Sequence, residues 1–143
     1  MTVVVQVSEV VDRPVEGVFH FYAHDHIRNH PRWDPDMRLE QLSDGPIGLG
    51  TMIRRVNTHS GNPVEGVMTI VEFEPNRSFA VEIQDGPIRT NGRVTFAALG
   101  ASRTRITISA EFPGIDDPSL KERLTPLVQR SARNIKMLVE SEV

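Results

Sequence analysis

Two adjacent arginines are the strongest candidates for chemistry in this sequence. Arg54 and Arg55 are adjacent in a predicted strand, so one of them points inward and the other outward. Met52 and Val56 share the face of Arg54, which favours Arg54 as the inward residue. An inward guanidinium would hold a carboxylate, enolate or phenolate through a charge-assisted hydrogen bond. The alternative is that both arginines lie on a solvated rim or pair with surface acids.

Four of the five histidines lie close together, at positions 20, 24, 26 and 30. His20 and His24 are four residues apart and would share a helix face, as a metal-binding pair does. No third ligand is placed beside them, so exposed or capping histidines are favoured and no metal site is predicted. His30 is nearest to Trp33 and is the candidate general acid or base.

Trp33 is the only tryptophan, and two roles fit it. It is either a gate or stacking wall for a ligand, or a core residue that anchors a short helix. Large aromatic side chains mostly pack in cores, which favours the second role.

The longest helical pattern in the chain covers residues 116–143. Asp116 or Asp117 is suited to cap its start, and Pro118 suits the first turn. Pro126 predicts a bend, and the alternative is two shorter helices that meet near Thr125. The apolar face of this pattern consists of Leu120, Leu124, Leu127, Ser131, Ile135 and Leu138.

Strand patterns dominate the rest of the chain. Thr2–Val11 is a valine-rich strand, and Pro14 opens a helix that extends to Ala23 or His24, followed by a short helical turn that ends near Pro31. Short, turn-rich links then join six further strands, which favours antiparallel neighbours with one apolar face. These strands are Met37–Leu42, Thr51–Thr58, Val64–Phe73, Phe79–Gln84, Ile88–Ala98 and Thr104–Phe112.

A curved sheet and a long helix cannot touch everywhere, so a cavity is expected between them. Gly66 and Gly92 lack side chains where the core would need them, which either leaves room for a ligand or marks bulges in the sheet. The predicted ligand-binding residues are Trp33, Met52, Arg54, Met68, Ile70, Val81, Phe96, Ile108, Leu127, Ser131 and Ile135.

Several local motifs resemble those of one protein superfamily. They are Val11-Asp12-Arg13-Pro14, Pro31-Arg32-Trp33-Asp34-Pro35 after Asp25, Asp44-Gly45-Pro46 with Gly48 and Gly50, Val71-Glu72-Phe73-Glu74-Pro75, Ser102-Arg103-Thr104-Arg105-Ile106 and the ending from Asn134 to Glu140. Together with the order of elements, they resemble the START-like (SRPBCC, Bet v 1-like) superfamily, in its polyketide cyclase/dehydrase-like branch. Arg13 departs from the pattern, because the family often has a small residue there.

The resemblance implies an α+β helix-grip fold. In this fold a seven-stranded curved antiparallel sheet, two short N-terminal helices and one long C-terminal helix enclose a cavity for a hydrophobic ligand. Some members of the superfamily are cyclases, aromatases or dehydratases, and others carry lipids.

Size and composition narrow the remaining possibilities. The 143 residues suit one domain, residues 1–143, and the absence of cysteine excludes disulfides and thiolate sites. A net charge of −3 argues against nucleic-acid binding. No apolar run approaches the roughly 20 residues of a membrane span, and residues 1–11 lack the basic start of a signal peptide. We therefore expect a cytoplasmic protein, with no cofactor and as a monomer or homodimer.

Three functions are compatible with the sequence. The first is binding of a hydrophobic or amphipathic small molecule, such as a lipid or a polyketide-like ring. The alternatives are a polyketide cyclase, aromatase or dehydratase that uses Arg54 and His30, and a module that binds a protein partner.

Overall fold

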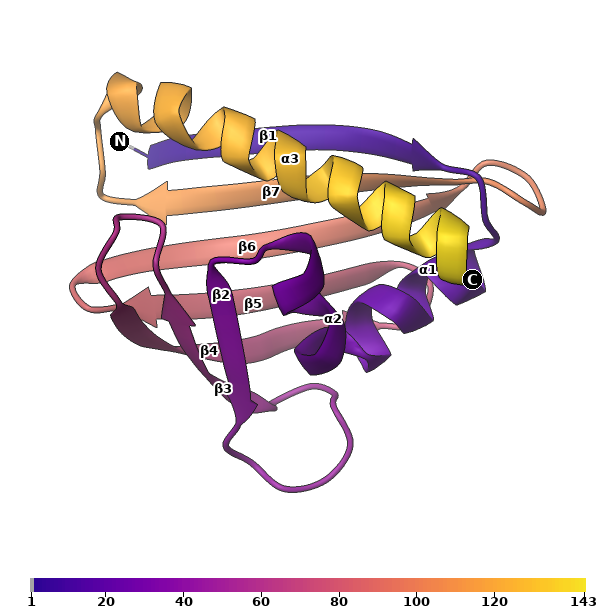
Figure 1. Ribbon diagram of the computed structural model, residues 1–143, viewed down its shortest axis with the longest axis horizontal. Helices are drawn as coiled ribbons and strands as arrows, with labels where there is room; N and C mark the ends of the chain where they lie inside the picture. Colours follow the sequence, from indigo (N-terminus) through magenta and orange to yellow (C-terminus); the bar gives the residue numbers. More distant parts are fainter. Residues whose placement is uncertain (1) are drawn as a thin grey trace.

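The computed structural model describes residues 2–143, which form one seven-stranded sheet with helices on one face (Figure 1). The strands are β1 (Thr2–Val11), β2 (Met37–Gln41), β3 (Met52–Asn57), β4 (Val64–Glu74), β5 (Ser78–Asp85), β6 (Ile88–Ala98) and β7 (Thr104–Pro113). The helical segments are α1 (Val15–Phe19), the π-helical turn η1 (His20–His24), α2 (His26–Trp33) and α3 (Pro118–Glu142). All seven predicted strands are confirmed, each to within one residue at either end.

The sheet has the order β1-β7-β6-β5-β4-β3-β2, and every neighbouring pair is antiparallel. The six later strands follow one another as a meander, and β1 joins β7 at the far edge. In Figure 1, α3 and the shorter helices lie over the same face of the sheet. This arrangement is the predicted helix-grip fold.

Helix α3 is continuous from Pro118 to Glu142, so the alternative of two helices meeting near Thr125 is wrong. The Asp117 side chain accepts a hydrogen bond from the Ser119 backbone N–H at 3.0 Å, which confirms one of the two predicted caps. A bend at Pro126 stays a prediction. The buried residues of α3 all lie in its second half, at Ala132, Ile135 and Val139.

The first helical segment ends at His24, as predicted, but it widens from an α-helix to a π-helix after Phe19. The Asp25 N–H bonds the carbonyl five residues back, that of His20, at 3.1 Å. Side chains of α2 bond two carbonyls in this wide turn: Asn29 donates to Phe21 and His26 donates to Tyr22, both at 2.9 Å. Helix α2 ends at Trp33, two residues beyond Pro31, close to its predicted end.

Aromatic side chains fill one end of the covered face. The Phe19 ring from α1 lies 5.1 Å from that of Phe96 on β6. The Tyr22 ring from η1 lies 5.5 Å from Phe79 on β5 and 4.8 Å from Trp33. The side chains of the short helices therefore pack closely on this end of the covered face, and α3 covers the other end.

Candidate ligand-binding cavity

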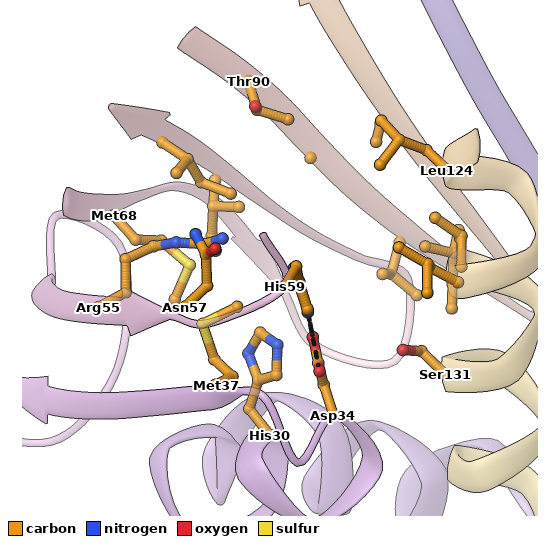
Figure 2. Close-up of a pocket in the computed structure, with 18 of the residues that line it drawn as sticks. His30, Asp34, Met37, Arg55, Asn57, His59, Met68, Thr90, Leu124 and Ser131 are labelled. Carbon is orange, nitrogen blue, oxygen red and sulfur yellow. Dashed lines mark hydrogen bonds and ion pairs between the residues drawn. The ribbon is translucent and has the colours of Figure 1, made fainter. Parts of the chain in front are cut away.

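A cavity of about 410 Å³ lies between the first half of α3, the covered face of the sheet and the end of α2 (Figure 2). Leu124, Leu127 and Val128 of α3 form one apolar wall. Met68, Val81 and Ile108 contribute apolar side chains from the sheet. The cavity thus occupies the part of the face that the aromatic residues of the short helices leave unfilled.

Most of the predicted ligand-binding residues border this cavity. Those in its wall are Trp33, Met68, Val81, Ile108, Leu127, Ser131 and Ile135, and His30 borders it as well. Ile70 and Phe96 are buried, but they do not border the cavity because they belong to the solid core; the Phe96 ring, for example, packs on Phe19.

The prediction that Arg54 and Met52 face the cavity is wrong. Arg54 Nε pairs with Glu65 Oε1 at 2.7 Å, and both side chains are largely exposed. Met52 shares this outer face and is 44% exposed. Arg55 is the inward arginine and lies in the cavity wall with only 10% of its side chain exposed.

An ion pair across strand β4 explains why Arg55 is tolerated inside. Arg55 lies opposite Gly66 of β4, and Gly66 lies opposite Asp85 of β5. Arg55 Nε is 3.1 Å from Asp85 Oδ1, at an angle outside hydrogen-bond geometry, and Asn57 Nδ2 donates to Asp85 Oδ2 at 3.0 Å. The buried guanidinium is therefore compensated by a buried carboxylate, as a charge removed from water requires.

Gly66 and Gly92, the two glycines that the sequence places in the predicted core, have different roles. A Cβ at Gly66 would overlap the Gln84 carbonyl oxygen and the Asp85 carboxylate, so Gly66 marks a close approach of strands. A Cβ at Gly92 would have only Val81 Cγ2 as a close neighbour, at 3.1 Å, and Gly92 lies in the cavity wall. Gly92 therefore leaves room in the cavity, and Gly66 does not.

Two histidines of α2 form a hydrogen-bonded chain beside the cavity. His26 Nδ1 bonds the Tyr22 carbonyl at 2.9 Å, and His26 Nε2 lies 3.0 Å from His30 Nδ1. Burial lowers the pKa of His26 to about 4. The pKa of His30 is also well below its usual value, first because of burial and then because of the neighbouring His26. Both imidazoles are therefore neutral near pH 7.

Trp33 packs as a core residue and does not present an open ring face. One side of its ring stacks on Tyr22 at 4.8 Å, and the His30 ring lies nearly parallel to it at 5.2 Å. Trp33 is 2% exposed, and its carbonyl accepts a hydrogen bond from Asn134 of α3. The geometry favours the anchoring role over the ligand-stacking role.

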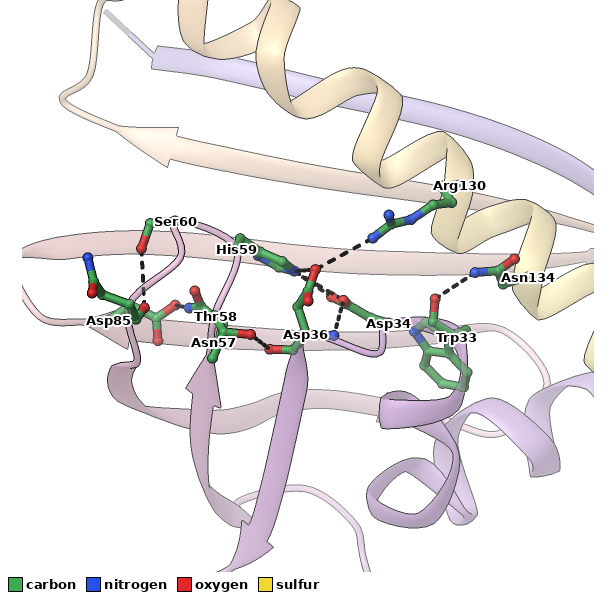
Figure 3. A network of polar contacts seen from close by, with 11 residues as sticks. Trp33, Asp34, Asp36, Asn57, Thr58, His59, Ser60, Asp85, Arg130 and Asn134 are labelled. Atoms are coloured by element: carbon green, nitrogen blue, oxygen red, sulfur yellow. Dashed lines mark hydrogen bonds and ion pairs between the residues drawn. The ribbon is translucent and has the colours of Figure 1, made fainter.

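Charged side chains at the edge of the cavity connect three segments (Figure 3). His59 Nε2, from the loop between β3 and β4, lies 3.1 Å from both carboxylate oxygens of Asp34, at the end of α2. The hydrogen bond with Asp34 raises the pKa of His59. Arg130 of α3 lies 3.8 Å from Asp36. No local sequence pattern predicts this cluster, because its members are far apart in the chain and meet only in the fold.

Asp34, Asp36 and His59 also bring one potential metal-ligating atom each to within 4.8 Å of one another. In the structure these carboxylates already pair with the His59 imidazole and with Arg130, so ion pairing accounts for the cluster. The His20 and His24 rings stack at 5.0 Å, and His20 is largely exposed and pairs with Asp25.

Within residues 2–143, no helix combines the length and the apolar character that crossing a membrane demands.

Solved structures with this fold share little sequence with the chain. A START superfamily protein from Mycobacterium smegmatis superposes with a TM-score of 0.82 at 15% identity, covering 98% of this chain and 99% of that one. Ara h 8.0201 gives 0.79 at 14% identity, covering 99% and 100%. The Zhui aromatase/cyclase from a Streptomyces species gives 0.75 at 18%, covering 99% and 93%. These similarities show the fold alone.

Searched by sequence, the curated proteins give no match to this chain. The model of one family, described as polyketide cyclase / dehydrase and lipid transport, matches residues 2–140. That match spans nearly the whole chain and agrees with the helix-grip fold and its cavity. The chain therefore belongs to the polyketide cyclase / dehydrase and lipid transport family.

Proposed function

We propose that this protein binds a small amphipathic molecule in the cavity under the first half of α3. The observation that carries the proposal is the hollow of about 410 Å³ itself. Protein interiors are packed as densely as organic crystals and leave few voids larger than a water molecule, whereas ligand pockets commonly measure about 300–1,000 Å³. The other end of the same face is filled by aromatic side chains, so the cavity under α3 is not a general feature of loose packing in this protein.

The two sides of the cavity differ in chemistry, which supports an amphipathic ligand. The α3 side is mainly apolar, through its leucines, Val128 and Ile135, with Ser131 and Arg130 as its polar residues. The opposite side carries His30, Arg55 and Asn57 from α2 and β3 (Figure 2). A ligand would place its apolar body against α3 and its polar end toward these residues. The family description, which names both cyclases or dehydrases and lipid transport, fits ligands of this kind.

A variant that fills the cavity from α3 tests this proposal. Naphthalene and longer apolar fluorophores are titrated into the wild type and Ser131→Phe, because Ser131 borders the cavity from the helix. We expect binding and a raised melting temperature for the wild type, and at least about tenfold weaker binding for Ser131→Phe. Ser141→Phe is the matched control, since Ser141 is exposed near the end of α3. Equal binding by wild type and Ser131→Phe would contradict the proposal.

The enzymatic alternative loses one of its two candidate residues, because Arg54 lies on the outer face. His30 remains beside the cavity as the candidate acid or base. Binding of a protein partner, the cytoplasmic location and the monomeric or homodimeric state stay predictions.

A further inference from the structure

The hydrogen-bond chain that ends at His30 fixes where its proton lies. The Tyr22 carbonyl oxygen only accepts, so His26 Nδ1 carries the proton of that 2.9 Å bond. A neutral His26 then has an unprotonated Nε2, which accepts a hydrogen bond from His30 Nδ1 across 3.0 Å. His30 in turn carries its proton on Nδ1, and its Nε2 is left with a lone pair.

The other arrangements of protons are unfavourable. Moving the His30 proton to Nε2 would set two lone pairs against each other at 3.0 Å. Adding a second proton to either ring would place a charge in a buried site, which its neighbours oppose. The groups that disfavour a charged His30 are the His26 ring, the Arg55 guanidinium and His59. Near neutral pH, His30 is therefore held as an acceptor at Nε2.

The charged groups of the cavity wall are already matched. Arg55 pairs with Asp85, His59 with Asp34 and Arg93 with Glu72, so each of these groups lies beside a carboxylate. Arg130 faces Asp36 at the edge. A ligand carrying a net charge would have to be buried without a counterion, which is costly. The wall as a whole suits an uncharged molecule.

We propose that the cavity selects uncharged ligands that carry a hydroxyl or N–H group, and that His30 Nε2 accepts their hydrogen bond. This inference rests on the proposed function and adds the chemical class of the ligand. His26 acts as the positioning residue, because its own bond to Tyr22 determines which nitrogen of His30 is free. His30 is already stacked beside Trp33, so its ring is oriented before a ligand arrives.

Four probes of similar size separate the effects of apolar burial, hydrogen-bond donation and net charge on binding. They are naphthalene, naphthol, the methyl ether of naphthol, and naphthoate. Dissociation constants are measured near pH 7 by fluorescence or calorimetry. We expect naphthol to bind about three- to tenfold more tightly than its methyl ether, the range that one net hydrogen bond supplies. Naphthoate, which is anionic, should bind more weakly than naphthol.

Histidine variants assign the preference to one atom. His30→Phe should bind naphthol and its ether about equally while retaining naphthalene. His30→Gln keeps an acceptor oxygen and should retain part of the preference. His20→Phe is the matched control, because His20 is 65% exposed and does not border the cavity, and it should behave as the wild type.

Nitrogen NMR of the wild type reads the proton positions without any ligand. We expect His30 to be the tautomer protonated on Nδ1 in the wild type, and a mixture of tautomers in His26→Phe. The opposite tautomer in the wild type would overturn the inference, even if the His30 variants failed to fold.

The outcomes separate this inference from the proposed function. If naphthalene and the ether bind but naphthol has no advantage, the role of His30 is refuted and the cavity remains a binding site. A naphthol advantage that survives in His30→Phe would likewise refute the role of His30. If none of the probes binds, the proposed function is refuted and this inference falls with it.

Discussion

At the scale of single residues, the Arg55–Asp85 ion pair depends on a missing side chain. The two charged residues lie on strands β3 and β5, and the strand between them carries Gly66 at the crossing point. Any side chain there would meet the Asp85 carboxylate and the Gln84 carbonyl oxygen. The glycine is thus part of the mechanism that keeps a guanidinium inside the protein.

Replacing Gly66 by alanine should therefore destabilise the fold. The added methyl group overpacks the crossing point and displaces Asp85, and overpacking of this kind typically costs about 1–3 kcal/mol. Urea denaturation measures the change in the free energy of unfolding. Gly92→Ala is the matched control, because Gly92 borders the cavity and its added methyl group would have only Val81 as a close neighbour. This variant should change the free energy of unfolding by less than about 1 kcal/mol. Equal losses in both variants would show that Gly66 has no special role.

The buried His26 should make the protein sensitive to mild acid. Its pKa falls from 6.5 to about 4 on folding, so only the unfolded chain takes up this proton as the pH drops through that window. The free energy of unfolding is highest above the unfolded value and declines as the pH falls, by about 3 kcal/mol over the whole window. His30 contributes in the same direction, because its pKa is also lowered.

Denaturation curves from about pH 7 to about pH 5 test this dependence. The wild type should lose stability across this range, and His26→Phe should lose less, whatever its stability at pH 7. Parallel curves for the two proteins would contradict the assignment of the acid sensitivity to His26.

The inward arginine shows where reasoning from one strand fails. The apolar neighbours Met52 and Val56 pointed to Arg54, although Ile53, which is fully buried, supports Arg55 instead. What decides between them is Asp85, thirty positions further along the chain and two strands away. A buried charge is permitted by its partner, and that partner is visible only once the strands are in register.

At the scale of elements, α3 serves two purposes along its length. Ala132, Ile135 and Val139 in its second half are buried. Its first half has no buried residue and covers the cavity with Leu124, Leu127 and Val128. The helix is therefore anchored at one end and only loosely supported at the other.

Hydrogen exchange should reveal this division. Amides in residues 120–131 should exchange faster than those in residues 132–142, because local opening is easiest where few apolar contacts oppose it. Binding of naphthol should slow amide exchange in residues 120–131 much more than in residues 132–142. Uniform exchange along α3, or protection confined to its second half, would contradict this division.

The regular elements were predictable because their patterns are local. Valine-rich composition, turn residues between segments and, in the later strands, period-two alternation predict the strands, and the spacing of Leu120 to Leu138 predicts the long helix with Asp116 or Asp117 as its cap. The π-helical turn at His20–His24 was missed. Its wide turn is matched by side-chain bonds from His26 and Asn29, and those bonds arise from tertiary packing that no local pattern encodes.

At the scale of the whole molecule, the sheet is covered in two different ways. The short helices bring Phe19, Tyr22 and Trp33 onto one end of it and fill that end. Helix α3 covers the other end from Leu124 to Ser131 without filling it. The ion pairs His59–Asp34 and Arg130–Asp36 connect the two coverings along the edge of the cavity. The fold thus produces both the cavity under α3 and the ion pairs that line its edge.

The fold and the existence of a cavity followed from the sequence, but its exact wall did not. Ile70 and Phe96 point inward as predicted, yet they are taken up by the solid end. Which inward residues remain open depends on how far the short helices reach over the sheet. That reach is set by the packing of Phe19 and Tyr22, which strand periodicity does not describe.

The most direct test of the binding cavity is a crystal structure of the protein with a bromonaphthol. Anomalous scattering locates the bromine, and the density shows the hydroxyl. The account predicts a bromine peak between the first half of α3 and the sheet, with the hydroxyl within hydrogen-bond distance of His30 Nε2. Two results would contradict the binding cavity: side chains filling the space so that α3 lies against the sheet, or bromine found only on the outer surface.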